Sequence, residues 1–395
     1  MIFKYFIYKN INIMKTIYDP IHGYMKFNKI LLKIIDTIEF KRLKNIKQLG
    51  FVHHVFPWAT HTRFEHSLGT CFLASKIINK INEKHPELNL SKKDILLIEI
   101  SALIHDLGHG PYWHFYDVFL KEKKIDWKHE IRWIKILQHI IDKYKINEIN
   151  ENDIKIISDI VLWTKKGFYY QIVSNKKNNL DCDKFDYICR DAYYLGMPYS
   201  IDYIRLIDDI TIINNDIFYP IKFKQYIYEI YNTRFKLFNN VYTHRVVQQI
   251  ELMMLDVFFL LDKYINLSDV NDIDNFININ DETIFNMIYK LQINNEDIII
   301  TKAKKILENI LSRKLYKFII ELNYDQNTYN IMMKKFKNKN IIFKSFKINY
   351  CNKQNNPLLK INFFDIPVDN DKYFDDLIYP INFQNNILRI FFRDN

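Results

Sequence analysis

The amino-acid sequence predicts a mainly α-helical protein, in which a helical core is followed by a smaller mixed α/β lobe. Gly and Pro number only 7 and 9 in 395 residues, which argues against a loop-rich all-β protein. Ile and Leu recur at helical spacing as far as about residue 265. Beyond that point the composition shifts toward Asn, Asp and Ile, and several segments alternate like strands. These observations predict a core over 15–265 and a lobe over 266–395.

The first elements of the predicted core are a turn and three helices. Residues 1–14 form an N-terminal extension, and Met14 offers a second start. YDPIHGY predicts a turn, and apolar spacing then predicts a helix over 27–50 that stops at Gly50. HHVFPWATHTRFEHSLG predicts a loop entering a helix, with His66 near its first turns. The next helix has Ser91 as its N-cap and should end near residues 108–111.

Further helices and three strands are predicted along the rest of the chain. KHEIRWIKILQHIIDKY predicts a helix, a polar connection precedes another, and a basic loop becomes helical around Asp181. Residues 222–263 predict one long helical stretch that carries Arg234, Tyr242 and His244. In the lobe, IIFKSFKINY, LLKINFF and ILRIFFR alternate like strands.

Composition limits the location and the partners of the chain. Lys and Arg exceed Asp and Glu by 10, which fits polyanionic partners such as nucleotides or nucleic acid, or merely reflects Lys-rich coding. The four cysteines form no CxxC motif, so a reducing intracellular compartment, cytoplasmic or nuclear, is expected. We expect no membrane partner, because no run of about 18 apolar residues occurs.

Histidine and aspartate gather in LIHDLGHGPYWHF, residues 103–115. Nine of the 12 histidines lie in residues 53–129. Clusters of His with Asp suggest metal ligation or phosphate chemistry. His66, the pair His105–Asp106, and either Asp181 or Asp183 would supply two imidazoles and two carboxylates. That mixed nitrogen and oxygen set suits Fe, Mn, Zn or Mg without selecting one of them.

Two histidines of the same segment remain after the metal ligands are assigned. His109 and His114 could be a general acid or phosphate ligands, and Glu130 could orient one of them. The basic and aromatic residues elsewhere in these segments also have purely structural interpretations. Arg63, Lys184 and Arg234 could be solvated charges, and Tyr187 and Tyr242 could belong to the core.

The same segments resemble the HD-domain superfamily, whose motif is H…HD…D. The chain is most similar to the SAM-and-HD-domain deoxynucleotide triphosphohydrolases, through YDPIHGYMKF, KQLGFVHHVFPWATHTRFEHSLG, ALIHDLGHGPYWHFYD, WKHE and IVSNKKNNLDCDKFDYICRDAYYLG in order. The match runs from about Lys15 to residue 260 and does not include a SAM domain. The resemblance implies cleavage of a dNTP to deoxynucleoside and inorganic triphosphate.

The resemblance also implies a role for each matching residue. The metal ligands would be His66, His105, Asp106 and Asp183. His114 would be the catalytic acid for the 5′-oxygen, supported by Asp117 and Glu130. The triphosphate-binding residues would be His109, His129, Arg63, Lys184, Tyr187 and Arg234. Gln48 and Asp191 would bind the sugar 3′-OH. Leu49 and Tyr242 would leave no room for a 2′-OH. Burying a hydroxyl without a hydrogen-bond partner costs about 1–3 kcal/mol.

Departures from the family concern its guanine-nucleotide activator site. Asp36 is kept, but Lys41 and Lys44 replace a Gln and an Arg of the family. Lys cannot make the bidentate contacts of Arg, so activation by GTP and the tetramer that it drives are not carried over. Arg205 could belong to the second activator site of the family.

Three functions follow from these observations. The first is a metal-dependent dNTP triphosphohydrolase that lowers dNTP pools, and Gln48, Asp191 and Tyr242 favour it. The second is another HD-superfamily phosphodiesterase or nucleotidase. The third is a non-catalytic protein that binds single-stranded nucleic acid. A homo-oligomer, dimer or tetramer, is expected, and a nucleotide effector is an open possibility.

Overall fold

The computed structural model describes residues 14–125, 129–198, 201–291, 297–364 and 379–394. The N-terminal extension over 1–14 therefore lies almost wholly outside the described residues. Helices dominate the described chain, as the sequence predicts, and small sheets accompany them. Among the described residues, no helix combines the length and the apolarity that are needed to cross a bilayer.

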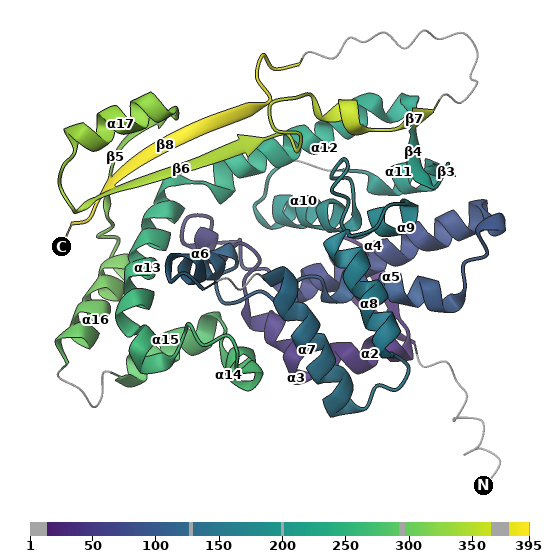
Figure 1. Cartoon of the computed structure of the whole chain (residues 1–395), viewed down its shortest axis with the longest axis horizontal. Coiled ribbons are helices and arrows are strands. Elements are labelled where there is room, and N and C mark those ends of the chain that lie inside the picture. Colours follow the sequence, from purple (N-terminus) through teal and green to yellow (C-terminus); the bar gives the residue numbers. More distant parts are fainter. Residues whose placement is uncertain (1–13, 126–128, 199–200, 292–296, 365–378, 395) are drawn as a thin grey trace.

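The N-terminal half is a hairpin followed by packed helices (Figure 1). Strand β1 pairs with β2 in antiparallel register, with Lys15 opposite Phe27. The elements are β1 (Lys15–Asp19), β2 (Gly23–Phe27), α2 (Lys29–Ile35), α3 (Ile38–Lys41), α4 (Arg63–Lys84), α5 (Lys92–Ile104), α6 (His114–Glu122), α7 (His129–Tyr144), α8 (Glu151–Leu162), α9 (Phe168–Gln171), α10 (Cys182–Tyr194) and α11 (Tyr203–Asp209).

The second half contains several helices and most of the strands. Strand β8 is the middle strand of the sheet β5-β8-β6, and Figure 1 shows α17 lying along one side of this sheet. The elements are β3 (Thr211–Ile213), β4 (Asp216–Pro220), α12 (Lys224–Leu237), α13 (Arg245–Ile265), α14 (Ile273–Asn278), α15 (Asp281–Leu291), α16 (Ile298–Leu311), β5 (Lys317–Asn323), α17 (Gln326–Lys335), β6 (Ile341–Asn349), β7 (Phe363–Phe364) and β8 (Gln384–Phe392).

Local capping signals place helix starts correctly. Asp94 N–H donates to Ser91 Oγ at 3.1 Å, and Asp94 Oδ2 accepts from Ser91 N–H at 2.9 Å, which forms a capping box at the start of α5. Asp181 caps α10 by accepting from Lys184 N–H at 3.1 Å. Each cap satisfies backbone donors that a helix N-terminus leaves unpaired.

Three predicted helices differ from the structure. The helix expected over 27–50 is interrupted after α2, because Thr37 accepts from Phe40 N–H and starts α3. Helix α5 ends at Ile104, earlier than expected, so His105 begins the turn. The stretch 222–263 is divided, because α12 continues into a π-helical turn over Phe238–Tyr242 and His244 then caps α13.

Segments of the predicted lobe contact the predicted helical core in this structure. Strand β7 pairs in parallel with β4, with Tyr219 opposite Phe363, so a C-terminal strand extends a sheet of the core. The hydrophobic core cluster includes buried residues of both parts, such as Met253 and Leu307. The division at residue 265 remains a prediction.

Candidate active site

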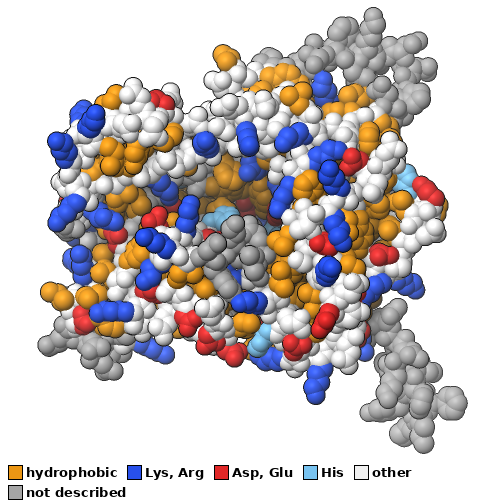
Figure 2. Space-filling model, viewed as in Figure 1, with side chains coloured by type: hydrophobic (Ala, Val, Ile, Leu, Met, Phe, Trp, Pro, Cys, Tyr) orange, Lys and Arg blue, Asp and Glu red, His pale blue; other side chains and the backbone are white. Residues whose placement is uncertain are grey.

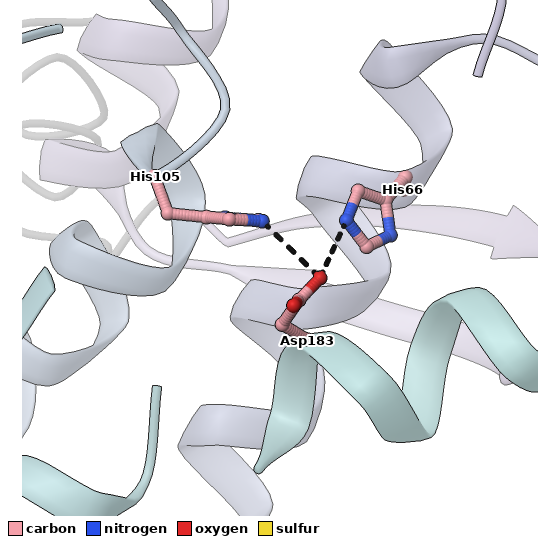
Figure 3. A group of neighbouring side chains, drawn as sticks. All are labelled: His66, His105 and Asp183. Atoms are coloured by element: carbon pink, nitrogen blue, oxygen red, sulfur yellow. Dashed lines mark ion pairs between the residues drawn. The ribbon is translucent and has the colours of Figure 1, made fainter. Parts of the chain in front are cut away.

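Two histidine side chains, one in a helix and one directly after a helix, converge on one carboxylate oxygen of Asp183. His66 lies in the first turns of α4, His105 directly follows α5, and Asp183 lies in the first turn of α10. Asp183 Oδ1 is 3.2 Å from His66 Nε2 and 3.6 Å from His105 Nε2 (Figure 3). Their potential ligand atoms all lie within 4.8 Å of one another, so these residues could hold a metal ion.

The other nitrogen of each imidazole fixes its tautomer. His66 Nδ1 is 2.7 Å from Asp186 Oδ2, and His105 Nδ1 is 2.7 Å from the carbonyl oxygen of Ala102. Both acceptors require a proton on Nδ1, so Nε2 is the nitrogen of each ring that faces Asp183 and that a metal could take once it is deprotonated. Both Nε2 atoms are buried and make no hydrogen bond. Two imidazole Nε2 atoms beside a carboxylate are a donor set that fits a metal cation.

The electrostatics of the cluster favour bound positive charge. Burial lowers the pKa of His66, but the carboxylates around it outweigh burial and raise that pKa to about 10. Burial raises the pKa of Asp183, but the two histidines and Lys184 hold it below its usual range. A divalent cation would meet the same need for positive charge that protons meet here.

Asp106 joins the same group from the turn after α5. Its two oxygens lie 3.4 Å from His66 Nε2 and 3.5 Å from His105 Nε2. Asp106 also pairs with Arg63 and lies 3.1 Å from His109 Nε2. The four residues expected to ligate metal therefore lie together, and their role as ligands remains a proposal.

Asp181 and Asp183, which the sequence alone left as alternatives, take different positions. Asp181 accepts hydrogen bonds from Asn175 N–H at 2.8 Å and from the Lys184 ammonium at 3.0 Å. It therefore ends the loop and caps α10, whereas Asp183 faces the two histidines.

Sequence reasoning missed the buried network behind His66. Asp186 accepts two hydrogen bonds from Arg190, both at 2.9 Å, and lies 2.6 Å from His22 Nε2. A Cβ atom on Gly69 would lie 1.9 Å from Asp186 Oδ1, so only glycine lets α4 approach this pair. The i, i+4 spacing of Asp186 and Arg190 was the one local feature of the sequence that could have predicted this ion pair.

A cavity of about 360 Å³ opens beside the histidine–aspartate cluster. Figure 2 shows a hollow on one face of the molecule in which histidine and hydrophobic side chains are visible. Most residues to which the sequence assigned a role line this cavity, namely Gln48, Leu49, Arg63, His105, Asp106, His109, His114, Asp183, Lys184, Tyr187, Asp191, Arg234 and Tyr242. His66 is fully buried and does not line it.

Cationic side chains occupy one part of the cavity. Burial lowers the pKa of Lys184, but Asp181 and Asp183 outweigh burial and raise it, so this ammonium stays charged. Arg234 Nε donates to the Tyr187 hydroxyl at 3.0 Å, and its Nη1 donates to the carbonyl oxygen of Asn349 at 3.1 Å. Charged donors held in this way suit an anionic ligand.

Another part of the cavity presents hydrogen-bonding groups and apolar surface. Asp191 accepts from the Tyr242 hydroxyl and lies 2.7 Å from His61 Nε2, a partner that sequence reasoning missed. Gln48 Oε1 is buried without a hydrogen-bond partner, and Leu49 is buried beside it in the chain. An unpaired buried carbonyl is costly unless a ligand supplies a donor.

The residues expected to act as acid lie at the start of α6. His114 is 53% exposed, and its Nδ1 is 3.7 Å from Asp117 Oδ2. Asp117 pairs with Arg132. The rings of His109 and His114 are 5.3 Å apart. His129 and Glu130 begin α7, but their side chains lie outside the described residues.

The residues compared with activator sites lie outside this cavity. Lys41 forms an ion pair with Asp36 at 3.2 Å, and the Lys44 ammonium lies 4.6 Å from the centre of the Phe64 ring. Arg205 follows the N-cap Asp202 in α11. The cavity lining includes none of them.

Comparison with known proteins identifies the family of the chain. The HD domain family model matches residues 63–185. The deoxynucleoside triphosphate triphosphohydrolase SAMHD1 homolog of Dictyostelium discoideum is 34% identical, and the match covers 96% of this chain and 77% of that protein. HD domain-containing protein L394 of Acanthamoeba polyphaga mimivirus is 37% identical, with 89% and 85% covered. Bovine SAMHD1 is 35% identical over 78% of this chain, but only 59% of its own length is matched. The chain therefore belongs to the HD-domain family that includes these SAMHD1 proteins.

Proposed function

We propose that the protein is a metal-dependent deoxynucleoside triphosphate triphosphohydrolase that converts a dNTP to deoxynucleoside and inorganic triphosphate. This proposal rests on one cavity in which a histidine–aspartate cluster, a cationic part and a polar part without Lys or Arg adjoin. A bound divalent ion, Fe, Mn, Zn or Mg, would supply Lewis-acid activation of water and offset phosphate charge. Relatives named as enzymes of this activity support the assignment.

Different residues of the cavity are assigned to the triphosphate and to the sugar of the substrate. Lys184, Arg234 and Arg63 bind the triphosphate, with His109 and Tyr187 beside them. The side-chain carbonyl of Gln48 accepts from the sugar hydroxyl, which gives its buried Oε1 the partner that it lacks. Tyr242 is held by Asp191 where a 2′-OH would come.

Proton transfer is assigned to the start of α6. His114 is exposed enough to reach the 5′-oxygen of the leaving group, and Asp117 lies 3.7 Å from its Nδ1. Arg132 pairs with Asp117 and orients it. His129 and Glu130 are assigned supporting roles on the motif match alone.

A product assay tests the reaction. Purified protein is incubated with each dNTP and Mn²⁺ or Mg²⁺, with and without GTP, and the released phosphates are separated. Triphosphate is the expected product. Monophosphate or diphosphate would instead indicate another HD-superfamily phosphodiesterase or nucleotidase. No product would favour the non-catalytic role, which salt-dependent binding of single-stranded nucleic acid would reveal.

Regulation and assembly are proposed separately. The ion pair with Lys41 partly neutralises Asp36, so we infer that guanine nucleotides activate this protein weakly or not at all. Sedimentation with and without GTP tests whether a homo-oligomer forms and whether the nucleotide changes it.

A further inference from the structure

The turn between His109 and α6 contains two consecutive non-glycine residues with positive φ. Tyr112 has φ 57°, and Trp113 has φ 66° with ψ −137°. This conformation is costly for any residue with a Cβ atom, and such residues concentrate at functional sites where the surrounding structure holds them. Trp113 is also the one residue of this turn, besides the two histidines, that lines the cavity.

Tyr112 anchors the turn on the side away from the cavity. Its backbone N–H donates to Asp281 Oδ1 at 2.7 Å, and its hydroxyl donates to the carbonyl oxygen of Asp281 at 2.8 Å. Its ring stacks on Phe51 with centroids 4.3 Å apart. With Tyr112 fixed in the core, the next side chain along the turn is directed into the cavity.

The indole of Trp113 touches three parts of the proposed site. Its ring lies edge-on to Tyr242, with centroids 5.8 Å apart, and 4.5 Å from the ring of His114. The Arg63 guanidinium lies 5.6 Å from its centre. Trp113 is partly exposed, like its neighbour His114, so both lie toward the mouth of the cavity.

We propose that Trp113 contacts the nucleoside part of the substrate, stacking its indole on the base and favouring purines; this inference rests on the proposed function. An uncharged ring with a single N–H donor offers a triphosphate little, and two of the three cations assigned to the phosphates, Lys184 and Arg234, lie on α10 and α12. A flat aromatic face suits a nucleobase, and the larger purine overlaps more of it. The adjacent sugar gate Tyr242 places the base on this side.

Steady-state kinetics with the four dNTPs test the proposal. Trp113→Ala should raise KM for dATP and dGTP by about 10-fold or more, and less for dCTP and dTTP, because stacking on an aromatic side chain is worth this much per base. The KM values of Trp113→Phe for dATP and dGTP should lie between those of the wild type and those of Trp113→Ala. The matched control is Trp163→Ala, since Trp163 also has a positive φ, 52°, but does not line the cavity. An equal loss of kcat for all four substrates, with KM unchanged, would mean that Trp113 only positions His114 and would overturn the proposal.

Fluorescence separates this proposal from the assigned reaction. The metal-loaded protein is mixed rapidly with dATP, and tryptophan emission is followed before products accumulate. Quenching should be largely lost in Trp113→Phe and kept in Trp163→Phe. Equal quenching in the wild type and Trp113→Phe would overturn the contact. If no dNTP yields triphosphate, the proposed reaction fails, yet loss of quenching in Trp113→Phe would still establish the nucleoside contact.

Discussion

Replacing Asp186 by Asn removes one charge from the buried carboxylate behind His66 while preserving its shape. Burial alone would raise the pKa of Asp186, but Arg190 and the two neighbouring histidines hold it well below its usual range. The carboxylate therefore stays charged and accepts from Arg190, from His66 and, on its other oxygen, from His22. An amide can accept at one oxygen only, so at least one of these donors loses its partner.

The size of the effect follows from these contacts. Breaking a buried ion pair by removing one partner costs about 3–5 kcal/mol of unfolding free energy. Removing the carboxylate that orients a metal-binding histidine lowers metal affinity by about 10- to 100-fold. Because a ligand stabilises the folded state in proportion to the logarithm of its affinity, added Mn²⁺ should stabilise Asp186→Asn by about 1.4–2.7 kcal/mol less than the wild type.

Urea unfolding with and without Mn²⁺, together with calorimetric titration of Mn²⁺, measures both quantities. The matched control is Asp19→Asn, because Asp19 pairs with Arg190 Nη1 at 2.8 Å but does not touch His66. That variant should lose stability and keep its metal affinity. If folded Asp186→Asn binds Mn²⁺ as tightly as the wild type does, Asp186 does not orient a metal ligand and the reasoning is wrong.

Four further predictions concern single residues. Burial raises the pKa of Asp281 to about 6, against about 4 in the unfolded chain. The contribution of Asp281 to the free energy of unfolding is therefore full below pH 4 and is lost as the pH rises to 6. Urea unfolding at a series of pH values should show this fall in the wild type but not in Asp281→Asn. Tyr242→Ala should admit ribonucleoside triphosphates, and unchanged discrimination in competition assays would reject it as the gate. Lys41→Gln should free Asp36 and increase any response of the rate to GTP. Gly69→Ala should lower the unfolding temperature by several degrees, since its Cβ would overlap Asp186.

Features that depend on neighbours in the chain could be predicted from the sequence. Ser91 and Asp181 were identified as helix starts because a cap and the backbone it satisfies lie within three residues. His105 and Asp106 adjoin, and both face His66, because the end of a helix fixes the directions of successive side chains. The break before His244 was missed because neither glycine nor proline marks it.

Features that join distant segments could not be predicted. His22 reaches Asp186 across 164 residues, and His61 reaches Asp191 across 130. A histidine in either place carries no local signal that distinguishes it from a core residue. Apolar periodicity predicts that a helix is buried, but it does not say which buried polar groups will meet.

The segment beyond residue 265, which the sequence predicts to be a smaller lobe, supports the candidate site directly. Arg42 Nε donates to the carbonyl oxygen of Ile279 at 3.1 Å, and its Nη2 donates to that of His109 at 2.5 Å. Asp281 accepts from the backbone N–H groups of both Lys47, at 2.9 Å, and Tyr112. Residues 279–281 therefore hold the loop before Gln48 and the turn before His114 in fixed positions from behind. Since preorganised side chains need such support, these contacts keep the residues proposed to bind the sugar and to act as acid in fixed positions relative to each other.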